Sequence, residues 1–266
     1  MFKANAQICR KYKIKTIYLI LKSFGLDVIL ALSSLKNIPY YVVTLLFFLS
    51  QRKKDKSFKL SPFPILSDCG RCQGHRYSTY FIQDLYFAKK IFKKKPGTHL
   101  DIGSRMDGFI SSLLVFRSVN FLDCSEVEHK IAKLNVIRKD LCKINKIKKQ
   151  FDSVSCLHAI EHFGLGRYGD SINYDGWKIG LKNISSYVKK NGDLYISVPI
   201  GNTQAVYFNA HRIFHPKTIL VELEANGFKL REFKVLDQHK KIRKINIFKR
   251  NDYDNCTAFY SFKKIY

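Results

Sequence analysis

Hydrophobic and polar positions alternate in blocks that, from residue 98 onward, predict strands and helices in turn. Apolar runs that end in Gly or polar residues predict strands at 98–104, 119–125, 151–160, 193–201, 228–237 and 256–264, the last two as a hairpin. Helical spacing of apolar residues predicts helices at 80–92, 108–116, 177–192 and 216–227, the third ended by Gly192 and the fourth by Gly227. This alternation indicates an α/β fold with a doubly wound, Rossmann-like sheet whose strand ends carry the site.

The chain before residue 76 follows another pattern, with apolar stretches on a basic background. Neither stretch, 16–34 or 38–50, reaches the roughly 20 uninterrupted apolar residues of a membrane-spanning helix, because Lys22 and Asp27 interrupt the first. The pattern predicts a helical arm, a linker and a main α/β domain, over 1–50, 51–75 and 76–266. Two roles of the arm stay open: peripheral contact with an anionic membrane face, or packing on protein.

Composition fits a folded chain in a reducing compartment. Of the 266 residues, 46% are hydrophobic, which is enough for one large core with an appendage. The seven cysteines form an odd set, and the early apolar run does not resemble a cleaved signal. We therefore expect a cytoplasmic protein, with any membrane contact at the inner face. The lone C-x-x-C of residues 69–72 lacks the second ligand pair of a structural zinc site.

Charge leaves the class of partner open. The net charge of +26 would attract phosphates, nucleic acid or an anionic membrane. The Lys residues are nevertheless spread over the whole chain, and no arginine-rich arm or known nucleic-acid motif concentrates them. A solvated Lys-rich surface explains this distribution without nucleic acid.

One short segment has the spelling of a zinc site. His158, Glu161 and His162 form H-x-x-E-H, and Glu232 lies downstream as a third ligand. That site requires a sustained helix, whereas a buried strand pattern precedes His158 and two glycines follow within a turn. The segment is better interpreted as the carboxyl end of a strand beside a binding site, and we expect no metal.

The ordered series of segments resembles the class I S-adenosylmethionine-dependent methyltransferases over residues 75–266. Asp101 closes the first strand of "HLDIGSRMDGF", and Gly103 allows backbone amides to approach a ligand closely. "FLDCS" looks like the family's second strand, which would place Asp123 at the ribose hydroxyls, and "NVIRKDL" its next loop, with Asp140 at the adenine. "FDSVSCLHAIEHF" resembles the fourth strand. The resemblance implies an S-adenosylmethionine site at Asp101, Gly103, Ser104, Arg105, Gly108, Asp123, Asp140 and His158.

A narrower resemblance points to one family. "HLDIGSRMDGFI", "LHAIEHFGLGRYGD" and "SVPIG" followed by "FNAHRIFHP" are similar to domain of unknown function 268. This is a bacterial and nematode family, and its bacterial members often lie near surface-polysaccharide genes. The resemblance implies a sugar or nucleotide-sugar acceptor.

The glycine-rich turn departs from the pattern of the superfamily. Arg105 stands where D-x-G-x-G-x-G has its second glycine, and Gly108 comes later. Two outcomes stay open: Arg105 crowds the methionine end of the cofactor, or its guanidinium pairs with the carboxylate there.

Residues after the fourth and fifth strands are the candidates for acceptor chemistry, because ligands of open α/β sheets lie beyond the carboxyl ends of the strands. The catalytic candidates are His162, His211 and Glu161, and the acceptor-binding candidates are Arg167, Tyr168, Asp170, Asn209 and Arg212. Three hypotheses follow: a methyltransferase for a small-molecule or glycan acceptor, an RNA methyltransferase, and a scaffold of this fold that does not catalyse.

Overall fold

The protein consists of two units, Met1–Arg76 and Tyr77–Tyr266. The structure is a computed structural model. It describes residues 16–51, 63–67, 78–125, 130–143, 149–249 and 252–266. The C-x-x-C of residues 69–72 and the first 15 residues of the predicted arm lie outside the described residues. The predicted roles of arm and linker stay predictions.

The described part of the first unit is largely helical. Its helices are Thr16–Ser23, α2 (Val28–Lys36) and α3 (Ile38–Gln51). Asp27 caps α2 by accepting a 3.0 Å hydrogen bond from the backbone N–H of Leu30. Among the described helices, none is by itself long and apolar enough to cross a membrane. Thr16–Ser23 and α2 satisfy that criterion only as a pair, and they meet at a bend of 85°.

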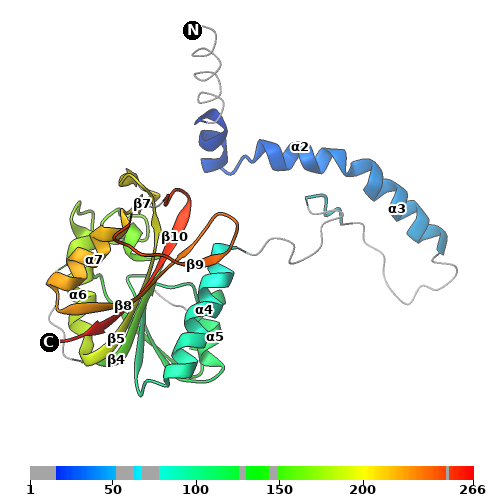
Figure 1. Ribbon diagram of the computed structural model, residues 1–266. Coiled ribbons are helices and arrows are strands. Elements are labelled where there is room, and N and C mark those ends of the chain that lie inside the picture. Colours follow the sequence, from blue (N-terminus) through cyan, green and yellow to red (C-terminus); the bar gives the residue numbers. More distant parts are fainter. Residues whose placement is uncertain (1–15, 52–62, 68–77, 126–129, 144–148, 250–251) are drawn as a thin grey trace, which may run out of the picture. The chain divides into compact units, whose positions relative to one another are not determined.

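An eight-stranded sheet forms the centre of the second unit, in the order β3-β2-β1-β4-β5-β10-β8-β9 (Figure 1). Neighbouring strands from β3 to β5 are parallel, and β10 runs antiparallel to both β5 and β8. The strands are β1 (His99–Ile102), β2 (Val119–Asp123), β3 (Leu134–Arg138), β4 (Phe151–Leu157), β5 (Val188–Ile200), β8 (Phe228–Leu236), β9 (Ile242–Lys244) and β10 (Cys256–Lys264). The α/β sheet and the closing antiparallel pair are therefore confirmed.

Helices cover both faces of this sheet (Figure 1). On one face, Leu181 and Ile184 of α6 and Leu223 of α7 belong to one buried cluster. On the other, Phe87 of α4 and Leu113 of α5 belong to a second. The helical segments are α4 (Thr79–Lys94), η1 (Met106–Ile110), α5 (Ser111–Leu114), η2 (Ile160–His162), α6 (Gly176–Tyr187) and α7 (Pro216–Ala225). A small hairpin lies apart from the sheet and consists of β6 (Ala205–Tyr207) and β7 (His211–Ile213).

Two sequence predictions were wrong in detail. Helix α6 ends at Tyr187 rather than at Gly192, because Val188 already pairs with Phe151 and begins β5. The turn predicted near Gly192 instead lies within this strand as an irregularity of the pairing, with Asn191 at a φ of 59°. Strand β3 was expected only as a loop, since its burial pattern has no fully buried position to produce an apolar run.

Deleting residues 1–50 should leave the second unit folded, because both of its buried clusters come from residues after 86. The truncated protein should retain one cooperative thermal transition, measured by circular dichroism. By contrast, Phe87→Ala in the full chain should cost about 3–5 kcal/mol and lower Tm by several degrees, since Phe87 is wholly buried. Loss of the cooperative transition on truncation would show that the arm is part of the core.

Candidate active site

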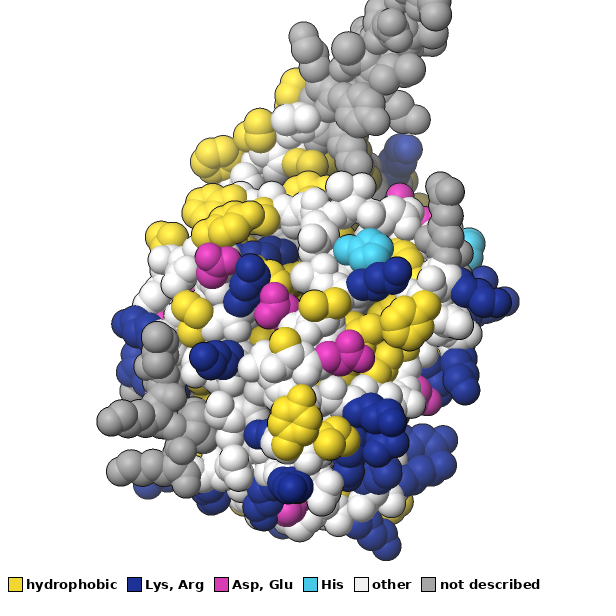
Figure 2. Space-filling model, turned by 60° about the vertical axis from the view of Figure 1, so that its left-hand side comes forward, with side chains coloured by type: hydrophobic (Ala, Val, Ile, Leu, Met, Phe, Trp, Pro, Cys, Tyr) yellow, Lys and Arg dark blue, Asp and Glu magenta, His cyan; other side chains and the backbone are white. Residues whose placement is uncertain are grey.

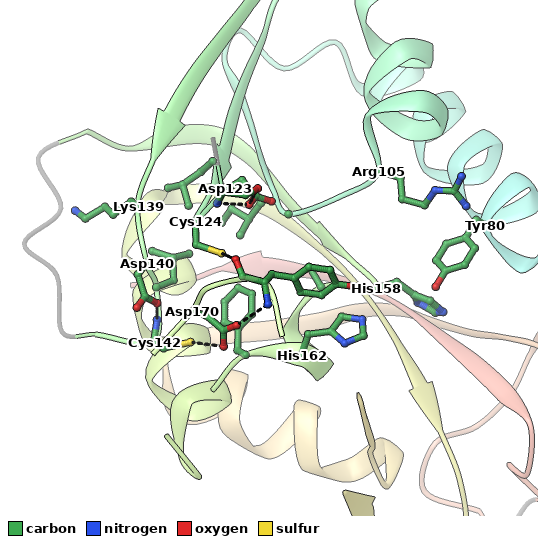
Figure 3. A pocket seen from close by; sticks show the side chains of 18 residues that line it. Tyr80, Arg105, Asp123, Cys124, Lys139, Asp140, Cys142, His158, His162 and Asp170 are labelled. Carbon is green, nitrogen blue, oxygen red and sulfur yellow. Dashed lines mark hydrogen bonds between the residues drawn. The ribbon is translucent and has the colours of Figure 1, made fainter. Parts of the chain in front are cut away.

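A cavity of about 400 Å³ lies at the carboxyl ends of β1, β2 and β4 (Figure 3). This volume suits a nucleoside-sized ligand. It is lined by Tyr80, Ile102, Gly103, Arg105, Leu122, Asp123, Cys124, Ser125, Lys139, Asp140, Leu141, Cys142, His158, Ala159, His162, Phe163, Tyr168 and Asp170.

The turn after β1 forms one wall. Gly103 has a φ of 67°, and its N–H donates to the carbonyl oxygen of Leu122 at 3.0 Å. A Cβ at this position would lie 3.0 Å from the Cβ of Ala159, closer than most real contacts. Only glycine fits both the backbone conformation and the space. The backbone of the turn can therefore face a ligand directly.

Asp101 supports this turn from beneath and does not line the cavity. Its side chain is fully buried and accepts hydrogen bonds from the N–H and Oγ of Ser104, at 3.1 and 2.8 Å, and from Oγ of Ser155 at 2.5 Å. Burial raises the pKa of Asp101 to about 7 despite these bonds. Gly108 also lies outside the cavity lining, where a Cβ would stand 2.2 Å from Oδ2 of Asp84. Of the predicted cofactor residues, Asp101 and Ser104 thus hold the turn in place, and Gly108 packs against Asp84.

The carboxylates of Asp123 and Asp140 also line the cavity. Asp123 ends β2, and its Oδ1 accepts hydrogen bonds from the N–H of Ser125 at 2.7 Å and from its Oγ at 2.5 Å. Its Oδ2 would lie 3.8 Å from a Cβ at position 103. Asp140 follows β3 and accepts from the N–H of Cys142 at 2.8 Å and the Oγ of Ser171 at 2.7 Å. Both carboxylates line the cavity, and their contacts with ribose and adenine stay predictions.

Arg105 stands at the rim with its guanidinium already engaged. Nε and Nη2 donate to the two carboxylate oxygens of Asp107 at 3.1 and 2.7 Å, and the group lies 5.1 Å from the ring centre of Tyr80. Figure 3 shows Arg105 and Tyr80 at one end of the cavity, away from Asp123 and Asp140. The pair with Asp107 uses Nε and Nη2, so a ligand carboxylate would have to approach the Nη1 side of the guanidinium.

The H-x-x-E-H segment is a strand end followed by a single helical turn. Strand β4 ends at Leu157, His158 has a φ of 51°, and η2 covers only three residues. Burial and the nearby His162 and His211 lower the pKa of His158 to about 3, so it is neutral at pH 7. Glu232 lies on β8, ion-paired with Lys90 and Lys234. Among the described residues, no cluster of three or more His, Cys, Asp or Glu side chains fits a metal ion.

The carboxyl of Glu161 is buried near the cavity and, among the described residues, lacks a hydrogen-bond partner for one of its oxygens. It is 2% exposed, and in the described part of the chain no hydrogen-bond partner meets its Oε2. Its Oε1 lies 3.9 Å from Nδ1 of His158 and 4.0 Å from Nε2 of His162. Burial raises the pKa of Glu161 to about 8, which leaves the carboxyl protonated at pH 7.

The contacts of His162 select its tautomer. Its Nδ1 lies 2.7 Å from the carbonyl oxygen of Ala210, and a carbonyl only accepts, so Nδ1 carries the proton. Burial lowers the pKa of His162. The neutral ring therefore has a free lone pair on Nε2, the requirement for a general base.

The loops after β4 and β5 meet beside the cavity, as predicted for the acceptor site. Nη1 of Arg167 donates to the same carbonyl of Ala210 at 3.1 Å, and the ring of Tyr168 meets His162 edge to face at 5.3 Å. Asp170 forms no ion pair with Arg167. It accepts from the backbone N–H groups of Gly164, Gly166 and Tyr168 instead, at 2.7, 3.2 and 3.3 Å.

Five of the predicted acceptor or catalytic residues do not line the cavity: Glu161, Arg167, Asn209, His211 and Arg212. Arg212 is buried, and its guanidinium donates to the carbonyls of Phe163 and Tyr174, at 2.5 and 3.1 Å, so it braces the loop and is not free for a phosphate. His211 lies on β7 with its ring 5.5 Å from that of Tyr207. Asn209 lies in the loop between β6 and β7.

Sequence reasoning missed ten residues that line the cavity, and five of them carry polar or ionisable side chains: Tyr80, Cys124, Ser125, Lys139 and Cys142. Tyr80 comes from α4, whose spacing indicated only an amphipathic helix. Cys124 and Lys139 directly follow Asp123 and Arg138, the last residues of β2 and β3, so the rule that ligands lie beyond strand ends would have included them.

Comparison with protein families decides the membership of the chain. The family model described as "Caenorhabditis protein of unknown function, DUF268" matches residues 113–250. The chain belongs to this family. The match includes the predicted stretches around His162 and Arg212, whereas the Gly103 turn precedes it. A search of the curated proteins finds no match.

Solved structures establish the fold of this family member as that of the class I methyltransferases. The glycopeptide N-methyltransferase MtfA complexed with sinefungin is 11% identical, with a TM-score of 0.50 over 74% of this chain and 97% of that chain. The 1,6-didemethyltoxoflavin-N1-methyltransferase of Burkholderia thailandensis is 14% identical, with a TM-score of 0.49 over 69% and 79%. NodS from Bradyrhizobium japonicum is 9% identical, with a TM-score of 0.47 over 70% and 87%.

The buried carboxyl of Glu161 should make stability depend on pH. Its folded pKa of about 8 lies above the ordinary value of 4.5, so the folded state holds the proton more tightly than the unfolded state. Its contribution to stability is complete below pH 4.5 and is lost as the pH rises toward 8. Urea unfolding should show wild type losing stability relative to Glu161→Gln across this window, by up to about 1.4 kcal/mol per pH unit.

An exposed residue provides the control for this measurement. Glu224→Gln on α7 removes the same charge from the surface and should track wild type at every pH. A difference between wild type and Glu161→Gln that stays constant from pH 5 to 8 would mean that Glu161 is ionised throughout.

Proposed function

We propose that the protein is an S-adenosylmethionine-dependent methyltransferase whose acceptor is a small molecule carrying a hydroxyl group, a sugar or a nucleotide-linked sugar. The observation that carries the proposal is the position of the Asp123 carboxylate beside the Gly103 turn in the lining of a single cavity, where Oδ2 of Asp123 would lie 3.8 Å from a Cβ at position 103. A glycine that leaves no room for a Cβ permits close backbone approach to a ligand, and a carboxylate can accept two adjacent ribose hydroxyls.

The residues of the cavity fit that cofactor. Asp123 would hold the ribose, and Asp140 would face the adenine end. His158 and Tyr80, which meet edge to face with ring centres 5.0 Å apart, would border the end nearer the acceptor. When bound, S-adenosylmethionine supplies an electrophilic methyl group on a positively charged sulfur.

The protein's part in the reaction is to hold and deprotonate the acceptor. Nε2 of His162 is the candidate base, because Ala210 fixes the proton on Nδ1. The carboxyl of Glu161, neutral before the reaction, lies 4.0 Å from Nε2, and loss of its proton would supply the negative charge that stabilises the imidazolium formed when His162 takes the acceptor proton. Glu161 therefore acts as a positioning and charge-balancing residue behind His162.

Exposed aromatic side chains near His162 support a ring-shaped acceptor. Tyr207 and Phe208, in the β6–β7 hairpin, are 53% and 72% exposed, and Tyr168 is 50% exposed beside His162. Flat aromatic faces offer stacking surfaces to sugar rings and bases alike. On the face in Figure 2, Lys and Arg lie in several separate places and form no single stripe, which gives no support to an extended RNA track.

Titration calorimetry with S-adenosylmethionine tests cofactor binding. Wild type should bind, and Asp123→Ala should weaken binding by at least about tenfold, or 1.4 kcal/mol, because two charge-assisted hydrogen bonds are lost. Glu224→Ala removes a charge from exposed α7 and should bind like wild type. Absence of heat with wild type at millimolar cofactor would favour the scaffold hypothesis, and equal affinity of Asp123→Ala would place the ligand elsewhere.

Methyl-transfer kinetics with nucleotide-linked sugars as acceptors separate the two roles near the cavity mouth. His162→Gln should lower kcat by roughly 10²–10⁴ with little change in cofactor affinity, since it removes a general base. Phe208→Ala should raise the acceptor KM and leave kcat nearly unchanged. Phe248→Ala, at an exposed aromatic outside this cavity, should alter neither constant. Unchanged kcat in His162→Gln would remove the base from the proposal.

A further inference from the structure

Helix α3 exposes apolar side chains around most of its circumference. None of its residues is buried in the structure. At about 100° per residue, Tyr40 and Phe47 share one side, Val42 and Leu46 another, and Phe48 a third. All five are at least 45% exposed. An amphipathic helix that packs on a folded domain has one apolar stripe, whereas an apolar surface on all sides requires an environment that surrounds the helix.

The preceding helix has the same character. In α2, no residue is buried, and the apolar side chains that are exposed are Val28, Ile29, Leu30, Leu32 and Leu35. The first described acid, Asp27, caps α2 and forms an ion pair with Lys22 at 3.0 Å, so its charge is compensated locally.

The charges of the sequence around these helices identify the chemistry of the surrounding medium. Residues 1–60 contain twelve Lys or Arg and only two acids, Asp27 and Asp55, and the basic run "QRKKDK" begins at the last residue of α3. An apolar segment bordered by basic residues matches a bilayer with anionic headgroups, which attract Lys and Arg while the acyl region takes up the apolar side chains.

We propose that residues 16–51 form a membrane anchor that inserts into an anionic lipid bilayer. The 14 residues of α3 span about 21 Å, less than the roughly 30 Å of a hydrocarbon core, so α3 by itself enters one leaflet without crossing. The second unit, with the candidate active site, is thereby held at the membrane surface. This inference is independent of the proposed reaction.

Flotation of the full-length protein with vesicles tests the anchor. The protein should float with vesicles of equal parts phosphatidylglycerol and phosphatidylcholine, and at least about tenfold less with phosphatidylcholine alone at low ionic strength. No flotation with the anionic vesicles would overturn the proposal. Equal flotation with both compositions would overturn its electrostatic part.

Paired variants separate insertion from nonspecific adsorption. The double variant Leu46→Glu with Phe47→Glu should reduce flotation at least about tenfold, because charges oppose entry into the acyl region. The matched control, Val115→Glu with Val221→Glu, changes two exposed apolar residues of the second unit and should float like wild type. Equal loss in both variants would overturn the proposal.

Self-association could also bury the apolar surface of α3. Sedimentation velocity without lipid tests whether the protein forms a dimer through this helix. A stable dimer that dissociates in the Leu46→Glu, Phe47→Glu variant and does not float with anionic vesicles would assign this surface to self-association and overturn the proposal. Wild type that floats as a monomer, with binding lost in that variant, would support the anchor.

Discussion

The geometry of the candidate site depends on one buried carboxyl, that of Asp101. It accepts hydrogen bonds from Ser104 in the turn after β1 and from Ser155 in the neighbouring strand β4. Oγ of Ser104 in turn accepts the backbone N–H of Leu157, the last residue of β4. One carboxyl thus links the turn that carries Gly103 to the strand end that carries His158. Loss of this link would separate the two walls of the cavity, although Asp101 does not line it.

Burial favours the neutral form of the ionisable groups near the cavity. It raises the pKa of Asp84 to about 6, of Asp101 to about 7 and of Glu161 to about 8, and it lowers the pKa of both His158 and His162. At pH 7, the protonated carboxyl of Glu161 therefore lies beside two neutral imidazoles, 3.9 Å from Nδ1 of His158 and 4.0 Å from Nε2 of His162. An ionised Glu161 would be a buried charge without a charged partner, which is costly in such a site.

The sequence was sufficient for the parts of the fold that follow from local patterns. Apolar runs at 119–125 and 151–160 predicted β2 and β4, which end at Asp123 and Leu157, and the order of strands and helices predicted the sheet. It was insufficient where long-range pairing decides the outcome: Val188 leaves the helix because Phe151 offers a strand partner. The same holds for Arg212, a suitable phosphate ligand by residue type, whose role depends on the carbonyls of Phe163 and Tyr174 that the fold brings to it.

Arg105 stands where the superfamily's glycine-rich turn has its second glycine, and its conformation shows why the missing glycine alone does not decide ligand binding. Arg105 has a φ of −66° and a ψ of 132°, which an L residue with a side chain adopts without strain, so the backbone does not require glycine there. The residue of this turn that adopts the left-handed conformation is Gly103, and a Cβ there would lie only 3.0 Å from the Cβ of Ala159. Since Asp107 and Tyr80 hold the guanidinium at the rim, the arginine narrows one end of the cavity and leaves its nucleoside-sized part accessible.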